Sequence, residues 1–136
     1  MQNKILLKDL LIANHFELIE DINSGSFGDF YCTYSNGDVL IRMVRDRSST
    51  SLDIGTIKDN KLWFDLGLIK ALIYKENDLK KVFAIEDSIN FLEQHLQLIK
   101  MLFNHEKYSS TKAALEDLEN KRVAQMFPSK KNYNES

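Results

Sequence analysis

Residues 27–45 read FGDFYCTYSNGDVLIRMVR and place an Asn-Gly pair between two runs of aromatic and β-branched residues. Asn-Gly is the strongest short-range signal for a two-residue hairpin turn, because both residues accept the positive φ that such a turn needs. We therefore expect antiparallel strands over Phe27–Tyr34 and Val39–Arg45, joined by a turn at Ser35–Asp38.

Further strands are predicted on both sides of this hairpin. The segment from Phe16 to Ile22 nearly alternates between apolar and polar residues, which predicts a strand that turns Phe16, Leu18 and Ile22 toward a core. Asn23–Ser26 has the composition of a turn. Leu52-Asp53-Ile54 is typical of a further strand of the meander.

Helices are predicted before and after the strands. A short amphipathic helix should cover residues 4–14, with one side formed by Ile5, Leu6, Leu10 and Ala13. After the strands, apolar residues become dense enough to predict a helix over about Asn60–Tyr74.

The clearest helical pattern follows, where apolar residues recur at spacings of four, three, four, three and four. The recurring residues, which form one seam, are Ile85, Ile89, Leu92, Leu96, Ile99 and Phe103. We expect a helix from about Asp87 to Phe103 that buries Ile89, Leu92, Leu96 and Ile99. Ser109 or Ser110 can cap a last helix, and Pro128, the single proline, should end it. The buried side of that last helix is expected to be Ala114, Leu115, Leu118 and Met126.

Length and composition bound the fold. The 136 residues suit one domain, which we place at 1–128, with 129–136 as a disordered tail. The expected class is α+β: an N-terminal helix, an antiparallel meander sheet of three or four strands, then three helices packing on one face. A single cysteine and no apolar run long enough for a membrane span predict a cytoplasmic, soluble protein.

Several classes of function are disfavoured. A net charge of −2 argues against a nucleic-acid partner. The histidines His15, His95 and His105 stand in separate contexts, so neither a metal site nor a cofactor is predicted. Cys32 has no neighbouring histidine in the sequence, and a buried structural thiol fits it better than a nucleophile. No catalytic residue is therefore predicted.

Three of the four arginines fall within six residues, Arg42-Met43-Val44-Arg45-Asp46-Arg47. Arginine presents a rigid fork of donors that matches a carboxylate or phosphate, whereas lysine does not. In a strand, Arg45 and Arg47 would share one face and Arg42 the other.

Two interpretations of this cluster stay open. The arginines can brace the hairpin by ion pairs with Asp29, Asp38 or Asp53. Alternatively, they bind an anionic group of a partner. The candidate binding residues are then Arg42, Arg45 and Arg47, together with the aromatic residues Tyr31 and Tyr34.

Four motifs carry a resemblance to a known group: Ser26–Tyr31 (SFGDFY), Ile41–Arg47 (IRMVRDR), Leu52–Gly55 (LDIG) and Trp63–Leu66 (WFDL). The chain resembles, over roughly Phe16 to Leu66, small bacterial proteins of unknown function, some of them associated with immunity proteins that neutralise polymorphic toxins. The resemblance implies a binding protein rather than an enzyme, with a protein partner such as a toxin domain.

Immunity proteins of this kind act by occluding the partner's active site. The alternative is an anion- or phosphate-binding enzyme or ligand-binding domain that uses Arg45 and Arg47. The sequence does not predict the oligomeric state.

Overall fold

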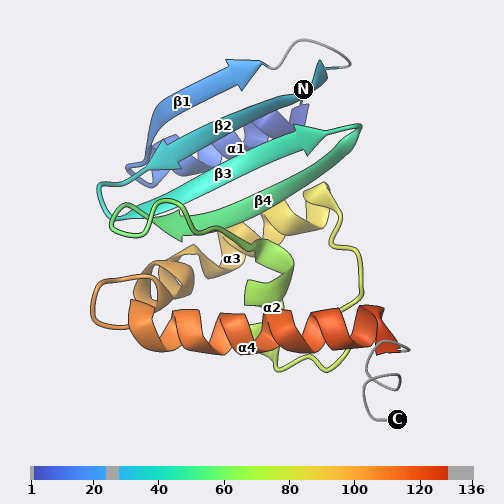
Figure 1. Ribbon diagram of the computed structural model, residues 1–136. Coiled ribbons are helices and arrows are strands. Elements are labelled where there is room, and N and C mark those ends of the chain that lie inside the picture. Colours follow the sequence, from blue (N-terminus) through green and yellow to red (C-terminus); the bar gives the residue numbers. More distant parts are fainter. Residues whose placement is uncertain (1, 24–27, 129–136) are drawn as a thin grey trace.

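The computed structural model describes residues 2–23 and 28–128, and it has the expected α+β architecture (Figure 1). The elements follow the order α1 (Gln2–Ala13), β1 (Glu17–Asn23), β2 (Phe30–Ser35), β3 (Val39–Asp46), β4 (Ser49–Thr56), β5 (Phe64–Asp65), α2 (Leu66–Tyr74), α3 (Ile85–Leu102) and α4 (Tyr108–Met126). The sheet is an antiparallel meander in the order β1-β2-β3-β4-β5, so it has five strands rather than three or four. Residues 24–27 and the tail 129–136 lie outside the described residues.

The predicted Asn-Gly hairpin is confirmed. Gly37 has a φ of 93°, a conformation that side chains rarely tolerate. The Asn36 side-chain oxygen accepts hydrogen bonds from the backbone N–H groups of Asp38 (3.0 Å) and Val39 (2.8 Å). This turn fixes the register of β2 on β3, with Ser35 opposite Leu40 and Phe30 opposite Arg45.

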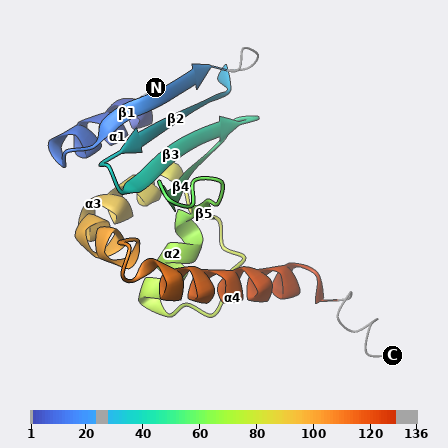
Figure 2. The same cartoon turned by 60° about the vertical axis from the view of Figure 1, so that its left-hand side comes forward.

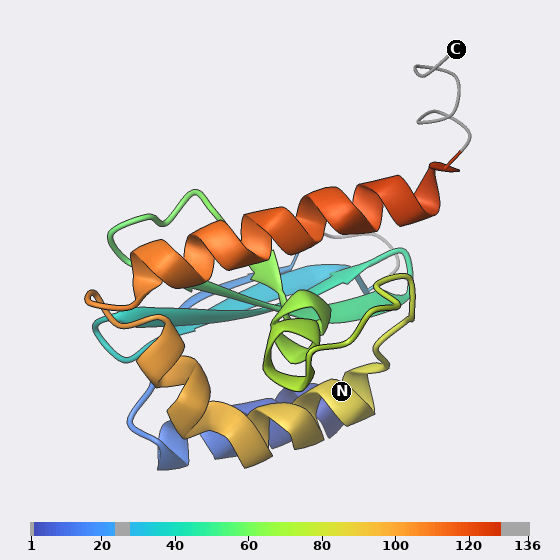
Figure 3. The same ribbon diagram turned by 90° about the horizontal axis from the view of Figure 1, so that it is seen from below.

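One face of the sheet is buried. Its strands contribute Cys32, Tyr34, Val39, Ile41, Met43, Leu52 and Ile54 to the core cluster. The helices α1 and α3 lie on this side of the sheet, α2 follows directly from β5, and α4 packs on α2 (Figure 3). The other face of β1 to β4 has no helix in front of it (Figure 1).

The predicted seam of α3 is confirmed. Ile89, Leu92, Leu96, Ile99 and Phe103 are all buried, and Ile85 is half-buried at the start of the helix. The seam contacts both α1 and β4, so it connects the first helix to the sheet.

The predicted buried sides of α1 and β1 are wrong. In α1 the buried residues are Leu7 and Leu11, while Ile5 and Leu6 are 58% and 47% exposed. The helix is rotated relative to the predicted orientation, because its Leu7–Leu11 side packs into the core with α3 and the sheet. In β1 every residue is exposed, including Leu18 and Ile22, and only Phe16 just before the strand is buried. As the edge strand, β1 has a neighbouring strand on one side only.

The predicted start of the helix at Asn60 is also wrong. Residues 57–63 form a loop, and Phe64–Asp65 pairs with β4 as β5. The helix α2 begins at Leu66, because the Asp65 carboxylate caps it by accepting a hydrogen bond from the Leu68 backbone N–H (3.1 Å).

The last helix differs from its prediction at its start, whereas its end next to Pro128 is as predicted. It begins at Tyr108, so Ser109 and Ser110 lie within its first turn and neither is the cap. It ends at Met126, two residues before Pro128. Leu115 is buried as predicted, but Ala114 and Leu118 are only half-buried and Met126 is 55% exposed.

The burial of α3 predicts the effect of shortening its side chains. Leu96→Ala should lower the free energy of unfolding by about 2–5 kcal/mol, because Leu96 is only 3% exposed and its truncation leaves a cavity in the core. Leu98→Ala on the same helix is the matched control, since Leu98 is 38% exposed and should cost less than about 1 kcal/mol. Urea unfolding followed by circular dichroism measures both; equal losses would contradict the orientation of α3.

Candidate functional site

A polar row crosses the open face of the sheet. Cross-strand pairing aligns one residue from each strand: Glu20, Thr33, Arg42, Asp53 and Asp65. The loop 57–63 brings Trp63 onto this face above β4. A side chain at position 55 would come within 3.0 Å of the Leu62 carbonyl oxygen and 3.3 Å of the Trp63 ring, so this close approach requires Gly55.

Arg42 is held inside the polar row by two neighbours. Its Nη2 donates to Asp53 Oδ2 at 3.0 Å, and its guanidinium lies 4.1 Å from the centre of the Trp63 ring. An arginine that is both ion-paired and stacked on an aromatic ring has little freedom to bind anything else. Arg42 therefore makes the ion pair with Asp53 that the bracing interpretation expects.

Two carboxylates of this row, Asp53 and Asp65, lie in a partly buried environment, whereas Glu20 is exposed. Burial raises the pKa of Asp53, the hydrogen bond and charge of Arg42 lower it, and the charge of Asp65 raises it further; the net direction is upward. Asp65 is itself paired with Arg122 of α4, at 2.7 Å between Oδ2 and Nη1. Arg122 also binds Glu119 at 2.7 Å, so it links α4 to the sheet.

Arg45 and Arg47 lie at the end of β3, where the predicted cluster continues into a tight turn. Arg47 and Ser48 have φ values of 52° and 65°, and they form a two-residue turn between Asp46 and Ser49, which face each other. Arg47 is therefore in the turn and does not share a strand face with Arg45. The Asp29 carboxylate accepts a hydrogen bond from the Arg47 backbone N–H at 2.9 Å.

Neither of these two guanidinium groups makes an ion pair within residues 2–23 and 28–128. Arg47 is exposed. Arg45 is half-buried, with Gly28 close to its guanidinium and with its Nε buried and without a hydrogen-bond acceptor in the same ranges. We call Arg45 and Arg47 the arginine rim.

The two candidate tyrosines lie on opposite faces of β2. Tyr34 is 2% exposed in the core, where burial raises its pKa to about 12, so it is not available to a partner. Tyr31 is half-buried on the open face, directly between Ile22 of β1 and Val44 of β3. We call Ile22, Tyr31 and Val44 the apolar row; it lies at the same end of the sheet as the arginine rim, while Arg45 alternates with Val44 along β3 and so lies on the opposite face.

The remaining reactive side chains are not brought together. Burial raises the pKa of the Cys32 thiol, which keeps it protonated and unreactive. His95 Nε2 lies 2.7 Å from the Tyr74 hydroxyl. Across the described residues, no three His, Cys, Asp or Glu side chains are grouped so that they could hold a metal ion. No helix in those residues is both long and apolar enough to cross a membrane.

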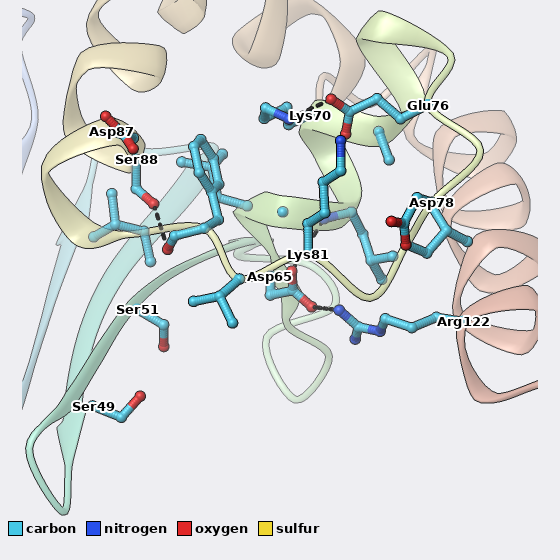
Figure 4. A pocket seen from close by; sticks show the side chains of 18 of the residues that line it. Ser49, Ser51, Asp65, Lys70, Glu76, Asp78, Lys81, Asp87, Ser88 and Arg122 are labelled. Carbon is cyan, nitrogen blue, oxygen red and sulfur yellow. Dashed lines mark hydrogen bonds and ion pairs between the residues drawn. The ribbon is translucent and has the colours of Figure 1, made fainter. Parts of the chain in front are cut away.

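A cavity of about 480 Å³ opens between β4, α2, the start of α3 and α4 (Figure 4). The sequence did not predict this cavity, because its lining residues come from segments far apart in the chain. Arg122, the one arginine outside the Arg42–Arg47 cluster, was the sequence feature that could have indicated it. Two of its cations are already paired, Lys70 with Glu76 and Arg122 with Asp65. Neither residue of the arginine rim lines this cavity, nor the smaller hollow beside Gln125.

Comparison of the chain with protein-family models, with curated proteins and with solved structures finds no match. The site therefore has to be interpreted from its own geometry.

The Arg42–Asp53 pair predicts a pH-dependent stability. Arg42→Ala should lower the free energy of unfolding by about 2 kcal/mol at neutral pH, less than for a fully buried pair because both side chains keep some exposure. Without the cation, the folded-state pKa of Asp53 rises further above its ordinary value of 3.8. A carboxyl group whose pKa is raised in the folded state favours folding at pH values below its ordinary pKa and disfavours it at pH values above the folded pKa. The loss of unfolding free energy in Arg42→Ala should therefore shrink as the pH falls toward about 4.

Unfolding curves at several pH values test this expectation. Lys121→Ala is the control, because Lys121 and Asp117 form an exposed pair that should contribute less than about 0.5 kcal/mol. If the loss of unfolding free energy in Arg42→Ala grew as the pH was lowered, the raised pKa of Asp53 would be contradicted.

Proposed function

We propose that this chain is a protein-binding module that holds its partner at the end of the sheet formed by the arginine rim and the apolar row. The observation that carries the proposal is the pair of guanidinium groups at one end of β3, neither of them ion-paired in the described chain. Guanidinium groups bind carboxylates in a fork geometry, and arginine and tyrosine are enriched among the residues that dominate protein interfaces.

The surface next to the arginine rim suits a macromolecule better than a small ligand. Tyr31 and Val44 are half-buried on an open sheet face, and Ile22 beside them is 41% exposed. A protein partner can cover such a face with about 800 Å² on each side. The two hollows described above lie elsewhere and are lined by other residues.

The conformation of Arg47 supports a binding role for the turn. Two-residue hairpin turns with both φ values positive favour Asn-Gly, yet this turn places Arg47 and Ser48 in that region. A side chain in the left-handed region costs about 1–2 kcal/mol. Such strain is typical of functional positions, where the side chain itself is needed.

The finer form of the proposal is an immunity protein. The resemblance to small bacterial immunity-type proteins favours a toxin domain as the partner, and neutralisation would follow from covering the toxin's active site. The alternative, an anion- or phosphate-binding enzyme, would need a pocket that contains Arg45 or Arg47. Neither of the two cavities described above contains them.

We expect Arg45→Ala combined with Arg47→Ala to weaken partner binding at least about tenfold, because each guanidinium supplies charge-assisted hydrogen bonds. A tagged copy recovers the partner from lysate of its own host, mass spectrometry identifies it, and titration of the purified pair gives the affinity. Lys107→Ala combined with Lys121→Ala removes the same charge from two exposed positions, one just before α4 and one within it, and should leave the affinity unchanged.

Two results would contradict the proposal. One is recovery of the same partner, with the same affinity, by the doubly substituted chain. The other is the absence of any specific protein together with consumption of a phosphorylated or carboxylated metabolite, which would favour the enzyme instead.

Glycine substitutions in the turn separate its strain from its charge. Arg47→Gly and Ser48→Gly should each raise the free energy of unfolding by about 0.5–1 kcal/mol, since glycine adopts a positive φ without strain. Only Arg47→Gly should weaken partner binding. Thermal unfolding and the same titration measure both effects; equal binding by the two variants would show that the Arg47 side chain is dispensable.

A further inference from the structure

We infer that the outer edge of β1 is a second binding surface, which takes up a basic, extended segment of another protein as an added strand. The inference goes beyond the proposed function, because it concerns a ligand segment of opposite charge and residues other than the arginine rim, although Ile22 also belongs to the apolar row.

The backbone of β1 is open on one side. The strand pairs with β2 alone, and it forms the outer edge of the sheet (Figures 1 and 2). All seven residues of Glu17–Asn23 are exposed. The N–H and C=O groups that point away from β2 have no strand partner in the described chain. A free edge of this kind is the surface to which extended peptides add as strands.

The side chains of β1 are unusually apolar for an exposed edge. Leu18, Ile19 and Ile22 are 45%, 57% and 41% exposed. Natural proteins commonly protect an edge with lysine, proline or a very short strand, and β1 has none of these. It does have a bulge at Ile19, after which pairing with β2 is regular from Glu20 to Asn23. The regular part is the segment on which an added strand would be centred.

The charge of β1 indicates which kind of extended segment can bind there. β1 contains three acids, Glu17, Glu20 and Asp21, and no base. Asp21 is paired with Lys4 of α1 at 3.0 Å, whereas Glu17 and Glu20 make no ion pair within the residues described. Opposite charges across neighbouring strands are stabilising and like charges are destabilising. The edge therefore fits a strand in which lysine or arginine alternates with apolar residues.

The same charges disfavour a second copy of this chain as the occupant. If two β1 edges paired antiparallel about Glu20, the two Glu20 carboxylates would lie opposite each other. A register shifted by three residues would place Glu17 opposite Glu20. In these two registers, self-association of β1 would bring carboxylates opposite each other without a compensating base.

Selection from a peptide library tests the inference. The probe is a displayed library of heptapeptides in which Lys or Arg alternates with Val, Ile or Thr, presented to the full chain, beside a matched library with Glu or Asp in place of the bases. We expect enrichment from the basic library alone. Binding of the enriched peptides should fall at least about tenfold in Glu17→Lys combined with Glu20→Lys. Glu106→Lys combined with Glu116→Lys, at exposed positions far from β1 in the sequence, should leave binding unchanged.

Amide hydrogen exchange locates the bound peptide, which should slow exchange within Glu17–Asn23. Arg45→Ala combined with Arg47→Ala should still bind the peptide, so failure of the arginine rim and failure of the β1 edge are distinguishable. Enrichment from neither library, enrichment from the acidic library, or protection of β4 instead of β1 would overturn the inference. So would a dimer in sedimentation that protects β1 without peptide, because the occupant would then be a second copy.

Discussion

The packing of α3 against one face of the sheet is the interaction on which the rest of the structure depends. The seam of α3 is buried with the inward residues of β2, β3 and β4, and it also holds α1 through Leu7 and Leu11. Burial of this kind stabilises the fold by about 25 cal/mol for each Å² of apolar surface removed from water. Because the core lies on one face, the open face, the hairpin tip and the β1 edge are left for binding.

The four arginines divide into two pairs with different environments. Arg42 is bound to Asp53 and stacked on Trp63, and Arg122 bridges Asp65 and Glu119. Both use the planar fork that lysine lacks, and together they connect the loop 57–63 and α4 to the sheet. The other two, Arg45 and Arg47, have the same chemistry but no carboxylate in the described chain. Proximity in sequence therefore did not imply a shared role for the three clustered arginines.

The parts of the fold that were predictable from the sequence are those set by local rules. Asn36-Gly37 specifies its own turn, and the α3 seam repeats over five turns, so neither depends on distant contacts. The face of α1 could not be predicted, because Ile5, Leu6, Leu7, Leu10 and Leu11 are all apolar and only the position of the sheet decides which are covered. The start of α2 was missed because Leu62, Trp63 and Phe64 have the composition of a helix but pack against β4 and Gly55.

The same division applies to the candidate site. The sequence indicated the arginine cluster, and the structure separated Arg42 from Arg45 and Arg47 through one partner, Trp63, whose position depends on a loop that was expected to be helical. Tyr34 was a candidate because strand alternation alone does not tell which face is buried. Leu18, its cross-strand neighbour on β1, lies on the same face as Tyr34 but is 45% exposed, because β1 is the edge strand.

The remainder of the chain covers one edge of the sheet more than the other. The β4 edge is partly paired with β5 and is followed by α2 and α4, and the charged side chains that line the cavity there include two internal ion pairs. The β1 edge receives only Lys4 from α1, through Asp21. Covering an exposed strand stabilises a sheet and protects it from unwanted pairing. The β1 edge thus keeps three aliphatic side chains and two glutamates without an ion pair exposed in the described chain, which is the composition on which the proposed strand addition rests.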